Sequence, residues 1–443
     1  MKIGLVSLGC PKNLVDSEVM LSLLTNKNMT LTNKPEEADV IIVNTCGFIE
    51  SAKEESINAI LQMGEYKSTG KCRYLLVSGC LAQRYANELF AEMPEIDALI
   101  GTACYEEIDR ILDKVLAGER VISLVPSKPE EEKNKKITRF ITTPAHTAYL
   151  KIAEGCDNYC SYCIIPKLRG PYKSRPFEEI MEEAKALVAG GVKELILVAQ
   201  DTTLYGQDLD GRLRLPELLG ALNALPDLHW IRVLYCYPKN FTDELIDAFA
   251  KYDKVCKYID LPLQHVSDDL LKRMNRHDSK AQIENLLSKL RARIAGVNIR
   301  TTFIVGFPGE TEEDFAILKE FVGDGKFDCA GVFTYSREEG TAAALMAKQI
   351  DEQVKQERYH ELMAIQAGVS EKIHIDLEEE VFEVLIEGFD SENKNIAIGR
   401  SFREAPEIDG IIYVENAPHV HVGDFVKVKI SQGFTYELAG ELQ

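Results

Sequence analysis

The sequence predicts an α/β protein of 443 residues in three parts: an N-terminal parallel α/β domain, a central partial (β/α)6 barrel and a small C-terminal all-β barrel. Two observations predict this fold class. Apolar, strand-like runs alternate with amphipathic stretches over most of the chain, which indicates parallel sheets covered by helices. From residue 375 onward, short β-rich runs separated by Gly, Asn and Asp are typical of a small barrel of the OB kind.

The first expected domain covers residues 1–125. Its strands are expected at Ile3–Leu8, Val40–Val43 and Tyr74–Val77, with helices near 14–24, 50–63 and 82–91. Because strands and helices alternate, the strands are expected to pair in parallel. Residues 126–146 follow. They are rich in charge and contain several prolines, a composition that predicts a linker.

Residues 147–370 carry a second and longer alternation. Six strands are expected, at Ala148–Ala153, Glu194–Ala199, Trp230–Leu234, Tyr258–Leu261, Arg300–Val305 and Cys329–Tyr335. Helical patterns lie between them, and residues 349–373 are expected to form one long helix. Six β/α units within about 190 residues indicate an incomplete barrel, because a full eight-unit barrel typically needs about 250 residues.

The last expected domain is residues 371–443. Five short strands are expected, at Val381–Ile386, Ile396–Gly399, Ile411–Val414, Phe425–Ile430 and Phe434–Leu438. The domain holds 16 acidic and 6 basic residues, a net charge of −10. Such a domain would bind a polyanion poorly and suits a basic protein partner. A solvated acidic surface without a partner is the common alternative.

Composition limits the function class. Hydrophobic residues make up 45% and charged residues 28% of the chain, as in an ordinary globular protein. The net charge of −20 argues against a broad electrostatic contact with nucleic acid, although a local basic groove would be compatible with it. The longest apolar runs are far shorter than the roughly 18 residues of a membrane span. The apolar run at the N-terminus is expected to be a strand and not a signal peptide.

These features lead us to expect a cytoplasmic protein without membrane contact. In that reducing compartment, its eleven cysteines are expected to serve metal binding or catalysis and not disulfides.

Cys156, Cys160 and Cys163 form the sharpest chemical motif, with three and then two residues between them. They follow the first strand of the expected barrel, at the end where barrel active sites lie. Three thiolates within eight residues can hold three irons of a 4Fe–4S cube and leave the fourth iron open to a small chelating ligand. A structural zinc site completed by a distant His or Cys is the alternative. Zinc sites usually use two Cys-x2-Cys pairs, however, and the sequence has no second pair.

Cys10, Cys46 and Cys80 form a less obvious set, since each stands at the end of an apolar run. The carboxyl ends of parallel strands meet at one edge of a sheet, so these three thiols are expected to converge and to form a second three-cysteine metal site. Three buried small hydrophobic residues are the alternative. The other five cysteines are expected to be packing residues: Cys72, Cys104, Cys236, Cys256 and Cys329.

Two further segments end strands of the barrel. Gly306 and Gly309 lie between a strand and a helix whose first turn carries a Thr-x-x-Asp cap at Thr311. Glycine here would let the backbone approach a ligand, and a tight turn would explain it equally well. His265 ends another strand, where it could serve as a ligand or base or, more in keeping with its type, as a hydrogen-bonded structural residue.

The three-cysteine motif at 156–163, with the aromatic Tyr162 before its last cysteine, resembles that of the radical S-adenosylmethionine superfamily. The upstream cysteines and the β-rich tail resemble the methylthiotransferase branch of this superfamily, in which the tail is a TRAM domain. The resemblance covers essentially the whole chain. The Cys156, Cys160 and Cys163 set is called the barrel triad below, and Cys10, Cys46 and Cys80 the N-terminal triad.

Within that branch, three segments resemble the enzymes that modify an aspartate of a ribosomal protein: Gly9–Glu18, Pro262–His265 and Arg403–Gly410. Branch members that act on transfer RNA usually have Gln-Met-Asn or Lys-Val-Asn after the first cysteine, whereas this chain has Pro-Lys-Asn. Relatives also more often have Ser at the position of His265.

The resemblance implies an enzyme that methylthiolates the β-carbon of an aspartate in small-subunit ribosomal protein twelve. It implies two 4Fe–4S clusters, one on each triad, and two uses of S-adenosylmethionine. One use gives a 5′-deoxyadenosyl radical at the barrel triad, and the other methylates a sulfide carried at the N-terminal triad. An external one-electron reductant is an expected partner, and nucleic acid is not expected as the main substrate. The expected contacts of the bound S-adenosylmethionine are Tyr162, Gly306, Gly309 and Arg276.

Two alternatives stay open on the sequence alone. A methylthiotransferase acting on an adenosine of transfer RNA would share the cluster chemistry and differ in its product. A non-enzymatic iron–sulfur or zinc scaffold would bind a partner through its small β-barrel and would not form 5′-deoxyadenosine.

Overall fold

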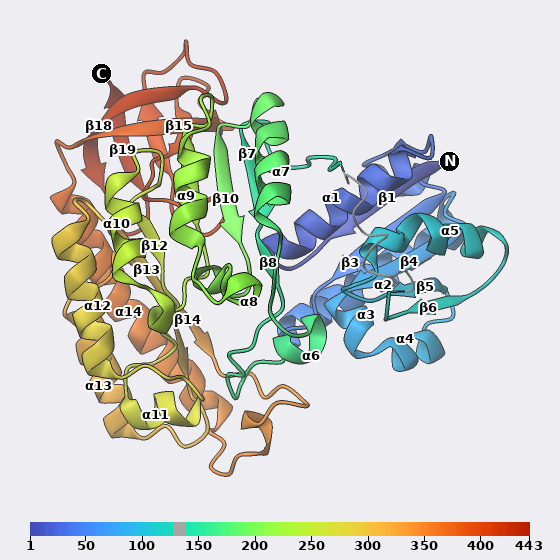
Figure 1. The fold of residues 1–443 in the computed structure, drawn as a ribbon, viewed down its shortest axis with the longest axis horizontal. Helices are drawn as coiled ribbons and strands as arrows, with labels where there is room; N and C mark the ends of the chain where they lie inside the picture. The colour runs from blue at the N-terminus through green and yellow to red at the C-terminus, as the bar shows by residue number, and fades with distance from the viewer. Residues whose placement is uncertain (127–137) are drawn as a thin grey trace.

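The computed structural model describes residues 1–126 and 138–443, so most of the charged part of the expected linker lies outside the described residues. The fold class is confirmed: an N-terminal α/β domain, a central partial barrel and a closed C-terminal β-barrel follow one another (Figure 1). None of the helices in the described part of the chain has the length and apolar character needed to cross a membrane.

The N-terminal domain is a parallel sheet in the order β2-β1-β3-β4-β5-β6. Its strands are β1 (Lys2–Ser7), β2 (Thr30–Leu31), β3 (Val40–Thr45), β4 (Tyr74–Gly79), β5 (Ile96–Ile100) and β6 (Val121–Ser123). Its helices are α1 (Pro11–Thr25), α2 (Glu50–Thr69), α3 (Cys80–Arg84), α4 (Ala86–Glu92) and α5 (Ile108–Leu116). The sequence pattern missed β2, β5 and β6, and the helix expected at 82–91 is divided at Tyr85.

Both faces of this sheet are buried, which explains why its strands are apolar without alternation. In β3, Val40 and Ile42 belong to the core that includes α1 and α5, whereas Ile41 and Val43 belong to the core that includes α2 and α3. The domain is therefore doubly wound, and the residues available to bind ligands lie at the edge where the strands end.

The central barrel consists of two three-stranded parallel ladders, β7-β10-β11 and β12-β13-β14, joined by a backbone bridge between Ile231 and Val255. Its strands are β7 (Thr147–Lys151), β10 (Glu194–Val198), β11 (Trp230–Val233), β12 (Tyr258–Asp260), β13 (Asn298–Val305) and β14 (Cys329–Thr334). A short antiparallel pair, β8 (Ala153–Glu154) and β9 (Lys173–Ser174), follows β7.

Helices cover the convex side of these strands (Figure 1). They are α7 (Phe177–Ala189), α9 (Leu215–Asn223), α10 (Asp243–Lys251), α12 (Lys280–Arg293), α13 (Glu312–Gly323) and the long α14 (Glu352–Asp376). The short helices α6 (Ile165–Arg169), α8 (Gln207–Asp210) and α11 (Asp268–Arg273) lie in the connections after β8, β10 and β12. Alternate strand residues face opposite sides of a sheet. Leu195 and Leu197 of β10 accordingly join the core with the helices, and Ile196 and Val198 face the concave side.

The C-terminal domain is a closed barrel in the order β15-β16-β17-β19-β18. Its strands are β15 (Val381–Phe389), β16 (Ala397–Arg400), β17 (Ile412–Glu415), β18 (Phe425–Gly433) and β19 (Leu438–Leu442). The strand expected at Phe434–Leu438 is wrong. The Phe434 N–H donates to the Glu437 carbonyl at 2.9 Å and closes a turn there, so the last strand starts only at Leu438 and runs antiparallel to β18.

This domain seals the end of the concave side where the strands of the central barrel begin (Figure 1). Glu194, the first residue of β10, is fully buried between two arginines, at 2.9 Å from Arg232 and at 2.7 Å from Arg400 of the C-terminal domain. Arg403 of the same domain pairs with Asp328 at 2.9 Å. Two of the six basic residues in the acidic tail are thus internal, and the opposite end of the barrel stays available for chemistry.

Glu194 is expected to stabilise this contact in a pH-dependent way. Burial alone would raise its pKa, but Arg400 and Arg232 lower it from the ordinary 4.5 to about 2. A depressed pKa in the folded state contributes stability above pH 4.5, and this contribution is lost as the pH falls toward 2. We expect Glu194→Gln to lower the free energy of unfolding by about 3–5 kcal/mol at pH 7, because it leaves the buried Arg232 without a carboxylate and Arg400 with Glu387 alone. Urea unfolding at pH 7, 4.5 and 3 measures the loss, which should shrink as the pH falls.

Asp243→Asn is the matched control for this experiment. Asp243 pairs with Lys289 and Arg293 on the exposed surface, where ion pairs contribute little. The free energy of unfolding of the Asp243→Asn variant should stay close to that of the wild type. Equal losses in the two variants would contradict the role of Glu194.

Candidate functional site

The barrel triad lies in the loop after β8, at the end of the central barrel where the strands finish. The loop is tightly folded: Gly155 has φ +78°, and a Cβ there would lie 2.0 Å from the Pro171 carbonyl oxygen, so only glycine fits. Burial, followed by the neighbouring Cys160 and Cys156, raises the pKa of the Cys163 thiol to about 12. The Cys163 N–H donates to the Cys160 carbonyl at 3.0 Å, so the last two cysteines of the triad lie in one turn.

The N-terminal triad is contributed by three neighbouring strands, since its cysteines follow the carboxyl ends of β1, β3 and β4. Gly9 has φ +87°, and a Cβ there would lie 2.8 Å from the Cβ of Cys46, so glycine allows the two cysteine loops to approach. Burial, followed by Cys80 and Cys10, raises the pKa of the Cys46 thiol to about 11. These thiols also converge, at the sheet edge that the sequence indicates.

Both sets of donors fit an iron–sulfur cluster, because each consists of three thiols. Each cysteine of a 4Fe–4S cube binds a different iron, so the thiols need not meet at a single ion. Among the described residues, no group of three or more His, Cys, Asp or Glu side chains is arranged to hold one metal ion. The remaining cysteines lie in hydrophobic cores or are half-buried: Cys72, Cys104, Cys236, Cys256 and Cys329.

The two triads lie next to each other. Cys80 packs in one small buried cluster with Ile164 and Leu168, and Ile164 directly follows Cys163. The helices that carry these residues, α3 and α6, lie side by side (Figure 1). The Thr102 hydroxyl donates to the Leu168 carbonyl at 2.6 Å and adds a second contact between the domains. A group delivered from one triad therefore has a short path to the other.

Arg169, the last residue of α6, is buried at this junction. Its guanidinium donates to Asp16 at 3.1 Å, to Glu154 at 2.8 Å and also to Asn13. Lys151 pairs with Glu154 at 3.0 Å and also with Asp16. Asn13 and Asp16 belong to α1, so this network fixes the helix after the first N-terminal cysteine relative to the helix after the barrel triad.

The loop after β14, residues 336–345, contacts both sides of the junction. Glu338 is only 2% exposed and accepts a hydrogen bond at 2.8 Å from Arg84, which ends α3 in the N-terminal domain. Further along, the Ala343 N–H donates at 2.8 Å to the carbonyl of Ser161, inside the barrel triad. One loop therefore supports the surroundings of both triads.

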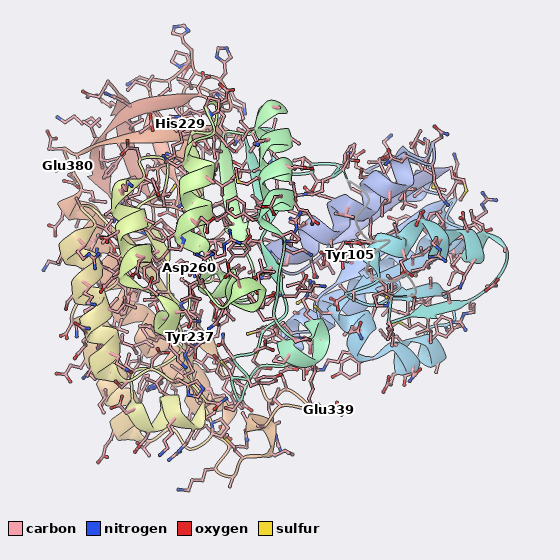
Figure 2. The ribbon with its side chains drawn as sticks, in the orientation of Figure 1. Tyr105, His229, Tyr237, Asp260, Glu339 and Glu380 are labelled. Carbon is pink, nitrogen blue, oxygen red and sulfur yellow. The ribbon has the colours of Figure 1, made fainter. Side chains whose placement is uncertain are left out.

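Two of the four expected cofactor contacts, Tyr162 and Arg276, lie beside the barrel triad. Burial, followed by Cys160, raises the pKa of Tyr162, and Arg276 opposes the rise. The buried Arg276 guanidinium lies 4.3 Å from the ring centroid of Tyr237, which is labelled in Figure 2, and donates to the Pro262 carbonyl at 2.9 Å. Its Nε has no partner among the described residues, so it keeps a donor for a bound anion.

The other two expected contacts, Gly306 and Gly309, have a structural explanation. Their φ angles are +73° and +80°. A Cβ at Gly306 would lie 2.3 Å from the Cγ of Lys355, and one at Gly309 would lie 2.2 Å from Nη1 of Arg273. The structure therefore favours the tight turn as the reason for both glycines, and their contact with the cofactor stays a prediction.

His265 is a structural residue by its contacts. It is fully buried, and its Nδ1 accepts a hydrogen bond from the Ser267 N–H at 3.0 Å. Its Nε2 faces Glu310 at 3.5 Å. The structure therefore favours a hydrogen-bonded structural role for His265 over a role as ligand or base.

Sequence reasoning missed several polar residues at the carboxyl end of the barrel. Asp201 is fully buried and is held by Asn158 at 2.9 Å. Buried polar atoms of Gln200, Tyr237 and Asp278 have no hydrogen-bond partner among the described residues. Except for Asp278, these residues follow β10 or β11, so the strand-end rule that indicated the cysteines would have found them.

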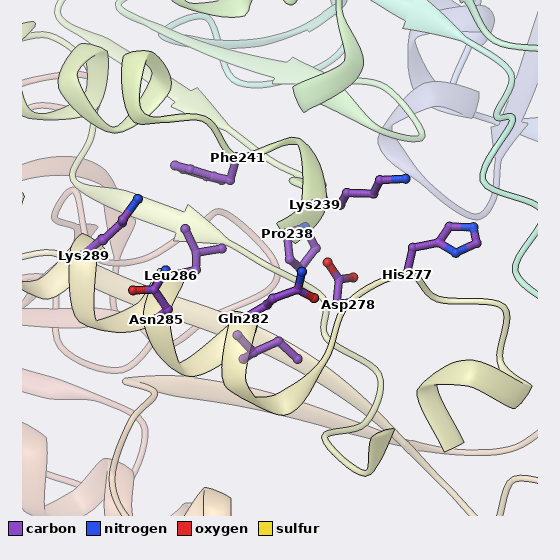
Figure 3. Close-up of a pocket in the computed structure, with 10 residues that line it drawn as sticks. Pro238, Lys239, Phe241, His277, Asp278, Gln282, Asn285, Leu286 and Lys289 are labelled. Atoms are coloured by element: carbon purple, nitrogen blue, oxygen red, sulfur yellow. The ribbon is translucent and has the colours of Figure 1, made fainter. Parts of the chain in front are cut away.

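A cavity of about 190 Å³ opens beside Asp278 (Figure 3). Lys239 and His277 line it on the side of the strand ends, and Lys289 lines it from α12. The cavity lies next to the site, and no cysteine of either triad lines it.

Three family models match the chain: Uncharacterized protein family UPF0004 at residues 2–101, the Radical SAM superfamily at 150–322 and the TRAM domain at 380–442. Two proteins named "Ribosomal protein uS12 methylthiotransferase RimO" are similar over their full length. The protein from Desulforamulus reducens is 52% identical, with 99% of each chain covered. The protein from Clostridioides difficile is 50% identical, with 100% of this chain and 99% of the relative covered. The chain belongs to the RimO methylthiotransferase family.

Membership of the RimO family makes the chain a radical SAM methylthiotransferase, and the radical SAM superfamily supplies a 4Fe–4S cluster and S-adenosylmethionine as cofactors. Among solved structures, the radical S-adenosylmethionine methyltransferase TsrM from Kitasatospora setae, with cobalamin and a [4Fe-4S] cluster bound, has a TM-score of 0.57. The comparison covers 78% of this chain and 74% of TsrM at 14% identity, and it shows a shared fold alone.

Metal analysis tests the two triads directly. Anaerobically reconstituted protein should bind about eight irons and about eight sulfides, because each triad offers the ligands of one 4Fe–4S cluster. The variant Cys156→Ala/Cys160→Ala/Cys163→Ala should lose about half of both. Cys72→Ala, in a hydrophobic core of the N-terminal domain, is the control and should keep the full amount. One tightly bound zinc with negligible iron would contradict the assignment.

Hydrogen exchange tests the loop after β14. Glu338→Gln should speed amide exchange in α3 and in the barrel-triad loop, because it weakens a buried charged hydrogen bond that joins the domains. Glu339→Gln is the matched control. Glu339 is exposed, and its backbone carbonyl is the group that accepts from Arg84 at 2.7 Å. Equal protection in both variants would show that Glu338 does not hold the junction.

Proposed function

We propose that this chain methylthiolates the β-carbon of an aspartate in ribosomal protein uS12, replacing one C–H bond with a C–SCH3 bond. The observation that carries the proposal is the packing of Cys80 against the residues after Cys163, which sets two three-thiol sites side by side. The full-length relatives named as uS12 methylthiotransferases support this substrate, and they do not favour the transfer-RNA alternative.

The substrate explains why radical chemistry is needed. The β-carbon of an aspartate side chain has no usefully acidic proton, so a general base of ordinary pKa could not remove it. When bound, the clusters and S-adenosylmethionine supply a 5′-deoxyadenosyl radical and a methylthio group. The protein's own residues hold these groups, orient the substrate and exclude water.

We assign the S-adenosylmethionine-binding cluster to the barrel triad and the sulfur-carrying cluster to the N-terminal triad. Three thiols leave one iron of each 4Fe–4S cube without a protein ligand. We assign Arg276 to the carboxylate of S-adenosylmethionine, and its unused Nε supports this role. Tyr162 packs with Phe307 on the same side, and Gly306 and Gly309 shape the turn there.

The proposal also implies partners. Reduction of the cluster needs an external one-electron donor, because the reaction consumes electrons that thiols and carboxylates of the chain do not supply. The substrate is a ribosomal protein, so we place the enzyme in the cytoplasm. We do not expect nucleic acid as the main substrate.

Mass spectrometry of a deletion strain tests the substrate. Ribosomal protein uS12 should lose the mass of one methylthio group in place of hydrogen when this gene is deleted, and a plasmid copy should restore it. Methylthioadenosine in transfer RNA should not change. The reverse result would support the transfer-RNA alternative and overturn the proposal.

Variants of the two triads should divide the reaction. Without Cys156, Cys160 and Cys163, 5′-deoxyadenosine formation should stop. Without the N-terminal cysteines, cofactor cleavage should stay measurable while methylthio transfer stops, because the sulfur-carrying site is lost. Native rates of transfer in the N-terminal variant would show that those cysteines only pack.

A further inference from the structure

Lys12 is a buried cation that reaches from the N-terminal domain into the central barrel. It is the second residue of α1, directly after the first cysteine of the N-terminal triad and Pro11, and is 6% exposed. Its Nζ lies 3.4 Å from the carbonyl of Ala199, which ends the β10 run, and 3.5 Å from the ring centroid of Tyr235, which follows β11. The ammonium group therefore lies at the carboxyl ends of the barrel strands, on a residue two positions from Cys10.

This ammonium group has no carboxylate partner among the described residues. It has three N–H donors, and its hydrogen bond to Ala199 is long and to a neutral carbonyl. No carboxylate oxygen of the described residues lies within 4.0 Å of the Lys12 Nζ, the distance that defines an ion pair. Other buried cations of the same junction each have a carboxylate: Lys151 with Asp16, Arg169 with Glu154 and Arg139 with Glu18.

The residues around Lys12 are fixed by hydrogen bonds, but one of their buried polar atoms has no hydrogen-bond partner among the described residues. Tyr235 has φ +62°, a strained conformation for a non-glycine residue, and its N–H donates at 2.8 Å to Asp260 (Figure 2). Gln200, the residue after Ala199, has a buried Oε1 without a hydrogen-bond partner among the described residues. Lys12 therefore keeps N–H donors beyond its one bond to Ala199, and the residue after Ala199 keeps an unused acceptor.

We propose that the Lys12 ammonium binds the side-chain carboxylate of the substrate aspartate; this inference rests on the function proposed above. The β-carbon of aspartate is bonded to the carboxyl carbon, so fixing the carboxylate also fixes the carbon that reacts. Lys12 is two residues from Cys10, which places the bound carboxylate next to the sulfur-carrying triad. The charge also selects an acidic residue over a neutral one, since the ammonium binds a carboxylate more strongly than an uncharged amide oxygen.

A double-mutant cycle across the two proteins tests this. Affinity is measured anaerobically between the reconstituted enzyme, wild type or Lys12→Met, and uS12 carrying either its native aspartate or asparagine at the modified position. We expect Lys12→Met to weaken binding of native uS12 by about 10- to 100-fold. Asparagine should weaken binding to the wild-type enzyme by a similar factor. The two changes together should cost little more than either alone.

Lys193→Met is the matched control. Lys193 also donates to a backbone carbonyl, that of Gly423 at 2.7 Å, and lies 6.0 Å from an aromatic ring centroid, that of Phe425. It does so at the opposite end of β10, against the C-terminal domain, so its variant should bind uS12 like the wild type. Lys12→Arg keeps the charge and should retain most of the affinity.

The outcomes separate the possible roles. Additive losses of affinity in the double variant would overturn the inference. Equal binding of the aspartate and asparagine forms of uS12 by the wild-type enzyme would also overturn it, and that comparison leaves the enzyme unchanged. An altered electron paramagnetic resonance spectrum of the N-terminal cluster with unchanged uS12 affinity would make Lys12 a support of that cluster and also overturn it. If the wild type leaves uS12 unmodified, the proposed function itself fails.

Discussion

The buried ion pairs of Arg169 are the interaction on which the rest of the site depends. One guanidinium holds Asp16 and Glu154, and through them α1 of the N-terminal domain and the strand that leads into the barrel triad. A buried pair of this kind is costly to break, because each partner would be left as an uncompensated charge. Cys80 of the N-terminal triad interacts with the same guanidinium, so this junction joins the network directly to the site.

Charged networks also divide the concave side of the central barrel into two ends. At the end where the strands begin, Glu194 joins Arg232 to Arg400, and the C-terminal domain closes the opening. At the end where they finish lie the cysteines, Arg276, whose Nε has no partner among the described residues, and Lys12, which donates only to a neutral carbonyl. The acidic tail therefore acts in part as a structural plug, a role that its net charge did not suggest.

The sequence predicted the order of the three domains and the two cysteine sets, because both follow from local patterns and from the shared edge of parallel strands. It did not predict contacts that join distant segments. Arg169 and Asp16 are 153 residues apart, and nothing in their neighbourhoods marks them as partners. The last strand was misplaced because a turn at Phe434 reads as apolar, strand-like sequence. Lys12 looked like part of a family motif, and only the fold shows that it lacks a counter-ion.

The tightly packed junction between the N-terminal domain and the central barrel also limits which substrate segments can reach the site. Separating the domains would break several buried ion pairs at once, which makes opening of this junction costly. A helix is about 10 Å wide with its side chains, too thick to thread between packed domains. Under the proposed function, such a junction admits an aspartate at the tip of a slender loop more readily than one on a helix or a sheet face of the same protein.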